Sequence, residues 1–549
     1  MIEFEHPLPA MYADGRKCGT YNNTELAIPG ILTTKDVRLG EFLHKLRINL
    51  YAGRTLVFVA NRVIMCNKNW IRDHVHVMKG IKYFEHDLSG FLDFILDTQR
   101  ADGQFYEMIK QQDDGHWKFV DEDCRIFYPE DRLTLVRLEL EADIEYLVVE
   151  GAMQYYQVTG DDVWLEKYLP RLEKGIDYLT SDVKRWDAAH GLVKRPFTID
   201  TWDFTNDKNS GGDRRIHADE KMSIMHGDNS GTYQAMQQLA WFNRRLGRTE
   251  KAAQWEARAA ELQKNMFRYL WNGHFFIHQL HLNHKGLDDQ EANRLSLSCT
   301  YDINRGVTDL AQARLILEEY QARRKTTDKF SEWFTIDPAY HLFNKYKEGE
   351  YVNGAISPFT AGELAKAAFN NGYEAYGWDI LERFIQLVER DHDVYFLYYP
   401  DSTPQPDGGP SAWGAAALLS AVDEGLAGIV NTDVAYRKIR FSPRFPVTPY
   451  TELRYFTGYE KTGSFVEVHY ICKAEGLRYD VISPAEEISA HLLLPAGKHA
   501  KMLLVNNQPV PFKEVKVGNS EYVDYTATTQ GKVSFELLFA EERTNEGSK

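Results

Sequence analysis

Two of the acidic side chains that stand directly beside a tryptophan are the first candidates for chemistry. Asp203 follows Trp202 in a stretch that also holds Asp200, and Glu332 precedes Trp333. An indole neighbour removes water from a carboxylic acid and raises its pKa, as a general acid requires. We therefore expect Asp203 to donate a proton to a leaving group. The alternative for the first stretch is a surface loop with two acids and a packed tryptophan.

Trp70, Arg72 and Asp73 lie together at a predicted junction between a loop and a helix. An Arg–Asp pair can hold two vicinal hydroxyls through charge-assisted hydrogen bonds, so the three residues are candidates for binding a sugar. The alternative is a helix start that Asp73 caps. His74 and His76 follow directly and add two polar rings to the same junction.

Further candidates for substrate binding precede or open predicted helices. Asp228 and Asn229 open one helix, where either side chain could instead be its cap. The remaining candidates are an aromatic and an amide ahead of one helix and an indole at the start of another, namely Tyr351, Asn353 and Trp413. If the helices close into a barrel, all these positions can converge on one mouth.

Apolar residues recur mainly at helical spacing from about residue 75 to about residue 430. Helices are expected to start near Gly231, Thr249, Thr308, Ile336, Pro358, Glu374 and Ala412. Several end in a glycine turn followed by a short strand-like piece, which is typical of stacked helical hairpins. Six such hairpins closed on themselves give a mainly α fold, an (α/α)6 six-hairpin toroid over residues 61–432.

The remaining segments differ in composition from this helical region. Residues 1–60 show few periodic signals and are expected to be an N-terminal extension packed on the barrel. Short β-rich runs separated by turn residues fill residues 433–540 and predict a small antiparallel β-sandwich. Residues 541–549 are polar and predict a flexible tail.

The bulk composition excludes several classes of partner. The net charge of −16 argues against nucleic acid and against an anionic membrane surface. Five widely spaced cysteines without a CxxC motif make a disulfide framework or a zinc site unexpected. The first residues lack a secretory pattern and no long apolar run exists, so a cytoplasmic location is expected. We expect no metal and no cofactor, and the sequence does not indicate an oligomeric state.

In these motifs the chain resembles the six-hairpin glycosidases, the superfamily of glucoamylase, trehalase and the amylo-1,6-glucosidase part of glycogen-debranching enzymes. Residues 70–73 match the Trp-Gly-Arg-Asp motif of the debranching family, and residues 202–204 match the Trp-Asp-Phe stretch of trehalases. Residues 351–358 and 411–414 resemble two further debranching motifs. The resemblance covers roughly residues 60–430. It implies a glycoside hydrolase that inverts the anomeric carbon, with an α-glucoside-type oligosaccharide as the expected substrate.

One position departs from the pattern of that superfamily. Debranching enzymes and trehalases place the catalytic base, a Glu, in the loop before the last barrel helix, whereas the acids of residues 394–409 are Asp401 and Asp407. We therefore expect Glu332 or one of these aspartates to activate the water, with Glu332 as the first candidate. An inverting mechanism would hold the acid and the base about 6.5–9.5 Å apart.

Two alternative functions remain open on the same barrel. A sugar epimerase or lyase could use His74, His76 and His226 as facing imidazoles. A non-catalytic carbohydrate-binding barrel would explain the missing Glu. A phosphorylase is less favoured, because no obvious basic cluster for phosphate is present.

Overall fold

The computed structural model describes residues 30–32, 37–110, 120–205, 214–406 and 409–540. The predicted tail and residues 1–29 of the predicted N-terminal extension lie outside these ranges. Among the described residues, no helix combines the length and the apolar character needed to cross a membrane.

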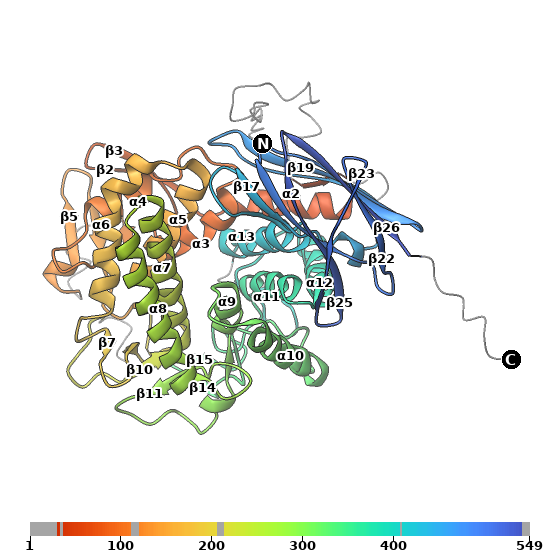
Figure 1. Ribbon diagram of the computed structural model, residues 1–549. Helices are drawn as coiled ribbons and strands as arrows, with labels where there is room; N and C mark the ends of the chain where they lie inside the picture. Colours follow the sequence, from red (N-terminus) through yellow and green to blue (C-terminus); the bar gives the residue numbers. More distant parts are fainter. Residues whose placement is uncertain (1–29, 33–36, 111–119, 206–213, 407–408, 541–549) are drawn as a thin grey trace.

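Six helices contact one another in a cycle in the described part of the chain. They are α3 (Ile71–Ile81), α5 (Ile144–Thr159), α7 (His226–Arg245), α9 (Ser298–Asn304), α11 (Pro358–Asn370) and α13 (Ala412–Ser420). Each contacts the next in this order, and α13 contacts α3. A π-helical turn, η6 (Ala421–Leu426), continues α13. The helices of this cycle occupy the centre of the view in Figure 1.

A second set of helices packs against the outside of this cycle. It consists of α2 (Arg38–Leu50), α4 (Gly90–Asp97), α6 (Asp162–Leu179), α8 (Thr249–Leu270), α10 (Leu310–Thr326) and α12 (Glu374–Asp391). Each contacts at least one helix of the cycle; α6, for example, contacts α5 and α7. The helix α2 belongs to the predicted extension, yet it contacts α3, α12 and α13.

Local capping explains where several helices begin. Asp309 and Gln312 form a reciprocal capping box at the start of α10. Ser357 caps α11 ahead of Pro358, and Ser411 caps α13 through the backbone N–H of Gly414. The starts predicted near Thr249, Pro358, Glu374 and Ala412 are confirmed.

The helix predicted to start near Ile336 is wrong. Ile336–Asp337 is a short strand, β13, that pairs with β12 (Leu295–Ser296). The apolar residues that follow fall in the hairpin of β14 (Leu342–Phe343) and β15 (Tyr346–Lys347), where Phe343 is buried and Leu342 is 46% exposed, so they do not form one buried helix face. The short α9 completes the cycle instead, and seven residues are too few to show a helical period.

Close packing between α11 and α13 depends on a glycine. A Cβ added to Gly362 would stand 2.4 Å from the carbonyl carbon of Ala417, in the backbone of α13. We therefore expect Gly362→Ala to lower the free energy of unfolding by about 1–3 kcal/mol, because the two helices must separate. Chemical denaturation measures this. Gly409→Ala, whose methyl group meets no described atom within 4 Å, is the control, and equal effects of both changes would refute the explanation.

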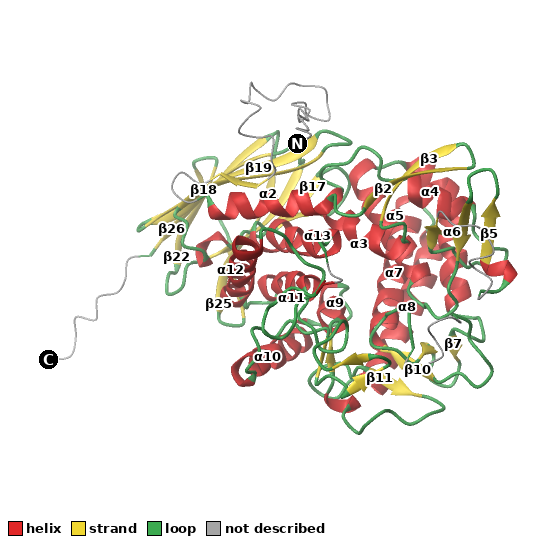
Figure 2. Cartoon of the chain, turned by 180° about the vertical axis from the view of Figure 1, so that it is seen from behind, coloured by secondary structure: helices red, strands yellow, loops and turns green. Residues whose placement is uncertain are grey.

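Two sheets form the C-terminal region. One has the strand order β16 (Ile429–Asn431), β17 (Lys438–Phe441), β21 (Glu487–Leu493), β25 (Ser520–Thr528) and β24 (Lys513–Val517). The other has the order β1 (Gly30–Leu32), β18 (Glu452–Tyr459), β19 (Ser464–Lys473), β20 (Gly476–Ile482), β26 (Lys532–Phe539), β22 (Ala500–Val505) and β23 (Gln508–Val510). Figure 2 shows these strands gathered on one side of the helices.

The two sheets face each other through aromatic side chains. Phe441 of β17 lies 5.5 Å from Tyr479 of β20 and 6.4 Å from Phe535 of β26, measured between ring centroids. The prediction of a purely antiparallel arrangement is wrong at one place, because β17 and β21 pair in parallel. The helix region contacts the sheets through Asp423 of η6, which accepts hydrogen bonds from Tyr83 and Tyr455.

Short strands lie in the loops that connect the helices. They are β2 (Arg54–Val59) with β3 (Arg62–Asn67); β4 (Met108–Lys110) and β5 (Arg125–Tyr128) with β6 (Leu133–Val136); β7 (Trp186–Asp187) with β8 (Leu192–Val193); and β9 (Arg195–Pro196) and β11 (Gln279–His281) with β10 (Met222–Met225). These loops carry several of the predicted site residues.

Candidate functional site

The amino ends of the helices in the cycle carry many of the predicted site residues. Trp70 is the N-cap residue of α3, and Arg72 and Asp73 lie in its first turn. Trp413 lies in the first turn of α13, and Tyr351 precedes α11. Because backbone N–H groups at these ends carry partial positive charge, they favour acidic side chains and polar ligands.

Arg72 is buried and held by two carboxylates that precede α5. Its Nε and Nη2 donate to the two oxygens of Asp143 over 2.5 and 2.8 Å, and Nη2 also donates to Glu141 over 2.6 Å. Burial acts to raise the pKa of Asp143, but the charge and hydrogen bonds of Arg72 outweigh it and lower that pKa. Within the described residues, Nη1 of Arg72 has no partner and is free to meet a ligand.

Asp73 and Asp203 are partly exposed carboxylates that act on each other electrostatically. Burial raises the pKa of Asp73, the charge of Asp203 raises it further, and Lys68, Arg72 and Lys110 oppose this rise. The side chain of Asp203 is 26% exposed, and one of its oxygens lies 4.0 Å from Nη1 of Arg214. The two acids therefore lie in the same polar, solvent-accessible region. Lys110 joins Trp70 to it, because its ammonium group lies 5.1 Å from the centroid of the Trp70 ring.

Aromatic rings form a continuous wall beside these acids. Trp202 stacks on Tyr351 at 6.0 Å between centroids and meets Trp413 edge to face at 5.9 Å. Trp413 in turn stacks on Phe359 at 4.7 Å, and Phe396 contacts all four rings. Such flat apolar faces suit the C–H faces of pyranose rings.

A pocket of about 310 Å³ opens next to this wall. Tyr351 and Phe396 line it together with Lys345, Tyr346, Glu350, Leu397, Tyr399, Gln405 and Pro406. Burial raises the pKa of Tyr351, and the charge of Asp203 adds to this rise. Tyr351 therefore lines the pocket and also lies near Asp203. This volume lies at the small end of the range for ligand sites and suits about one or two sugar rings.

Glu332 and Trp333 lie elsewhere, between the outer helices. Both oxygens of Glu332 accept hydrogen bonds from Arg383, at 2.9 and 3.0 Å, and one also accepts a 2.6 Å bond from Tyr376. Trp333 is fully buried with the Arg383 guanidinium 4.8 Å from its ring centroid. The structure therefore does not bring Glu332 to Asp203, and it leaves neither oxygen of Glu332 without a partner to activate water.

Asp200 and Asp228 are buried near the site but face inward. Asp200 accepts hydrogen bonds from the hydroxyl and the backbone N–H of Ser298, over 2.5 and 3.2 Å, and so fixes the start of α9. Asp228 lies 3.5 Å from Nη1 of Arg195, and burial raises its pKa to about 6. Neither acid is among the residues that line the pocket.

Asn229 and Asn353 hold the backbone of loops. The Asn229 amide bonds the N–H and C=O of Val193 and the C=O of Met225. The Asn353 amide bonds the N–H and C=O of Tyr340 in the same way. Both asparagines are fully buried, so the structure uses them to shape the loops around the site.

The loop before α13 carries the two aspartates that were predicted as alternative bases. Asp401 is exposed and accepts a hydrogen bond from the backbone N–H of Thr403. Asp407 lies outside the described residues. Gln405 and Pro406, just before it, line the pocket.

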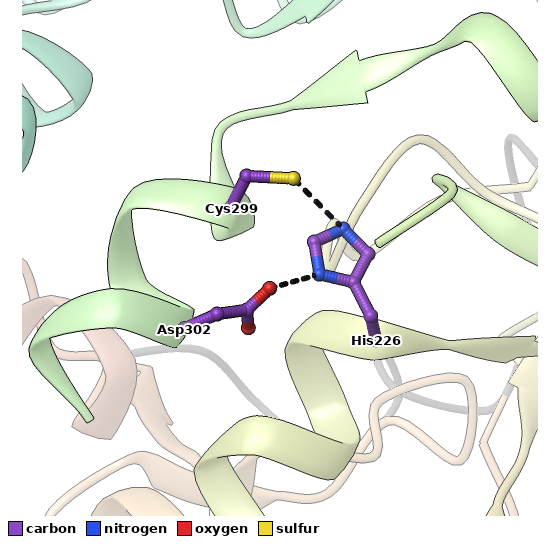
Figure 3. Close-up of side chains that lie close together, drawn as sticks. All are labelled: His226, Cys299 and Asp302. Carbon is purple, nitrogen blue, oxygen red and sulfur yellow. Dashed lines mark hydrogen bonds and ion pairs between the residues drawn. The ribbon is translucent and has the colours of Figure 1, made fainter. Parts of the chain in front are cut away.

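His226 forms a buried cluster with Cys299 and Asp302 that has the composition of a metal site (Figure 3). Its Nδ1 lies 2.6 Å from Asp302 and its Nε2 lies 2.8 Å from the hydroxyl of Ser296. Because Cys299 and Asp302 lie on opposite nitrogens of the ring, one ion cannot take all three as ligands without breaking the His226–Asp302 bond. The cluster fits a hydrogen-bonded link between α7 and α9 better than a metal centre.

The other histidines considered for an epimerase are buried and face different partners. His76 stacks on Trp413 at 4.2 Å between centroids, and His74 meets Phe91 edge to face at 5.2 Å. Burial lowers the pKa of both rings, that of His74 to about 4. Neither ring is among those that line the pocket, so they do not form a facing pair for a sugar there.

Three acids of the site were not identified from the sequence. Glu141 and Asp143 hold Arg72, and Glu107 lies beside them, close enough for the three charges to interact. Charged residues at every second position from Arg137 to Asp143, in an otherwise apolar stretch, are the signal that could have revealed two of them. Glu107 lies in a loop with no such pattern.

The family profile described as mannosylglycerate hydrolase MGH1-like glycoside hydrolase domain matches residues 69–410, which is more than half of the chain. No curated protein matches the sequence. The region matched contains all the predicted site residues except Trp413.

Solved structures of three rhamnosidases, the first two of them α-L-rhamnosidases, share the fold. The one from Dictyoglumus thermophilum has a TM-score of 0.58 and 12% identity, covering 93% of this chain and 50% of its own. The structure from Streptomyces avermitilis, complexed with L-rhamnose, has a TM-score of 0.58 and 13% identity, and the match covers 93% of this chain and 42% of that protein. The structure from Bacillus sp. GL1 has a TM-score of 0.57 and 14% identity, and the match covers 84% of this chain and 43% of that protein. The chain thus spans half or less of these proteins, and such low identity shows the fold alone.

Proposed function

Because the chain belongs to the mannosylglycerate hydrolase MGH1-like glycoside hydrolase family and is a glycosidase, we propose that it removes a terminal α-linked sugar with inversion at the anomeric carbon. The observation that carries the proposal is the position of Asp203. Its carboxylate is partly exposed, shares a polar place with Asp73 and Arg72, and follows Trp202 of the aromatic wall. We further propose that the two sets of helices form the predicted (α/α)6 toroid.

In this mechanism Asp203 is the general acid. Its proton passes to the glycosidic oxygen as the bond from that oxygen to the anomeric carbon breaks, and water attacks the same carbon from the opposite face. The water gives up its proton to a second carboxylate. Nη1 of Arg72 holds a hydroxyl of the sugar, and Asp73 holds another if the base is Asp407, while Tyr351 and Trp413 cover the apolar faces of the sugar.

The second carboxylate comes from Asp73 or Asp407 rather than from Glu332. Asp73 is partly exposed and interacts with Asp203, whereas both oxygens of Glu332 are bound to Arg383 and Tyr376. Asp407 follows two residues that line the pocket. Azide can replace a missing base, so the Asp→Asn variant that azide reactivates identifies it.

The family match, rather than the short motifs, limits the choice of candidate substrates. The matched profile carries the name of mannosylglycerate hydrolase, and it does not support the debranching or trehalase assignment that the short motifs favoured. The pocket of about 310 Å³ suits a terminal sugar better than an internal segment of a long chain. We therefore propose small α-glycosides, with mannosylglycerate and α-glucosides as the first candidates.

Hydrolysis of a substrate panel tests this function. The panel contains mannosylglycerate, aryl α-mannosides, α-glucosides and α-rhamnosides, and short oligosaccharides, with the anomer of the product followed by NMR. We expect at least one α-glycoside to release its sugar first as the β-anomer. Release of the α-anomer would refute inversion, and binding without hydrolysis across the panel would support the non-catalytic alternative.

A further inference from the structure

Glu107 is buried at the site without a partner for its charge. Its side chain has no exposed surface, and neither carboxylate oxygen has a hydrogen-bond partner among the described residues. Its backbone is fixed, because its N–H donates to the carbonyl of Val136 and its C=O accepts from Ile71 of α3. An ionised carboxylate in such a place is very unfavourable.

The neighbouring cations compensate this charge only in part: Lys110 acts on Glu107 from a partly exposed position, where Asp73 also acts on it, and Arg195 acts on Asp143. Arg72 and Arg137 are the buried cations of the group, and each already has a carboxylate bound to it: Asp143 on Arg72 and Glu145 on Arg137. Counting all its members, the group has four acids and two arginines, namely Glu107, Glu141, Asp143, Glu145, Arg72 and Arg137. Within these six residues, full ionisation would give two more negative than positive charges, which the more distant Lys110 and Arg195 offset only in part.

Glu141 offers a place for a shared proton. Its Oε2 accepts the hydrogen bond from Arg72, but its Oε1 is buried without a partner in the described part of the chain. Burial raises the pKa of Glu107, with the charge of Glu141 as the next cause, and burial raises the pKa of Glu141 to about 7.

We propose that Glu107 and Glu141 share one proton and together form a positioning pair that holds Arg72 in place to bind the sugar. The protonated carboxyl of one donates to an unpartnered oxygen of the other, so one negative charge is removed and Oε2 of Glu141 still binds Arg72. The role of Arg72 rests on the proposed function, whereas the shared proton does not.

Loss of the proton changes the site. At higher pH a second full charge appears beside Arg72 and near Asp203, whose own charge already acts on Glu141. Arg72 is then attracted more strongly to the buried acids, and its Nη1 is less available to substrate. Substrate binding should therefore weaken as the pair ionises, while the chemical step through Asp203 changes less.

Infrared spectroscopy of the full-length protein tests the proton directly. The wild type should show the C=O stretch of a protonated carboxylic acid near neutral pH, and Glu107→Gln should lose that band in the difference spectrum. Glu122→Gln, which replaces an exposed acid, is the control and should keep the band. Identical carboxylic acid bands in the wild type and Glu107→Gln would overturn the proposal.

The dependence of stability on pH gives a second test. A raised folded pKa contributes stability that is present below about pH 4.5 and is lost as the pH rises through about 7. The denaturant concentration at the midpoint of unfolding should therefore fall less for Glu107→Gln than for the wild type when the pH is raised from about 5 to about 8. Parallel curves would contradict the pair. If Glu107→Gln does not fold, the wild-type carboxylic acid band must itself disappear over this range.

The kinetics separate this proposal from the proposed function. We expect the wild-type KM to rise severalfold between about pH 6 and about pH 8 and the KM of Glu107→Gln to stay nearly constant, whereas any fall of kcat as Asp203 ionises should be the same in both proteins. A KM of the variant that follows the wild type would remove the positioning role. If no glycoside is hydrolysed, the proposed function fails while the infrared and stability results still decide the shared proton.

Discussion

Asp203→Asn should abolish most hydrolysis, by about 10²–10⁴-fold in kcat, on substrates whose leaving group needs a proton. The amide has the size of the carboxylic acid but cannot donate the proton to the glycosidic oxygen. The loss should be much smaller for an aryl glycoside with an acidic phenol, because that leaving group departs without protonation. Rates on the two kinds of substrate, measured under the same conditions, check this expectation.

Asp200→Asn is the matched control for this prediction. Asp200 lies three residues away and is bonded to Ser298 at the start of α9, so its replacement should lower stability and leave most of kcat intact. If instead Asp200→Asn loses the rate and Asp203→Asn keeps it, the roles of the two aspartates are reversed. A denaturation curve for each variant separates lost chemistry from lost folding.

Glu332→Gln should lower the free energy of unfolding by about 1–3 kcal/mol, because the buried Arg383 loses both charge-assisted hydrogen bonds to Glu332 and keeps only Asp379, a carboxylate at 2.7 Å whose side chain is 55% exposed. Both oxygens of Glu332 bind Arg383, and Tyr376 donates a further hydrogen bond. Measured well below the unfolding transition, kcat should stay within about threefold of the wild type, because the residue does not touch the proposed site. Chemical denaturation and steady-state kinetics on the same preparation provide both values.

The double variant Glu332→Gln with Arg383→Gln serves as the control. Removing both charges should recover part of the stability lost in the single variant, because the buried guanidinium is removed together with Glu332, and the remaining acid Asp379 is 55% exposed and reached by water. A fall of about 10²-fold or more in kcat for Glu332→Gln, with stability unchanged, would restore Glu332 as the catalytic base.

The helical part of the fold could be predicted because its signals are local. The capped starts of α10, α11 and α13 and the apolar periodicity of long helices such as α6 are present within a few residues of sequence. The short helix α9 and the strand at Ile336–Asp337 were missed because contacts with distant segments, rather than local propensity, decide them. The parallel pairing of β17 with β21 is likewise a choice between distant strands.

The sequence by itself determined the types of side chain at the helix starts and in the loops before them. These side chains made Trp70, Arg72, Asp73, Trp202, Asp203, Tyr351 and Trp413 candidates for a sugar site. It could not determine which acids keep a free oxygen, because that depends on partners far along the chain. In the tertiary structure Glu332 accepts hydrogen bonds from Arg383, and Asp200 accepts them from Ser298. Asp203 stays partly exposed. It also places Glu107 and Glu141 behind Arg72, where burial rather than sequence spacing sets the energy of their charges.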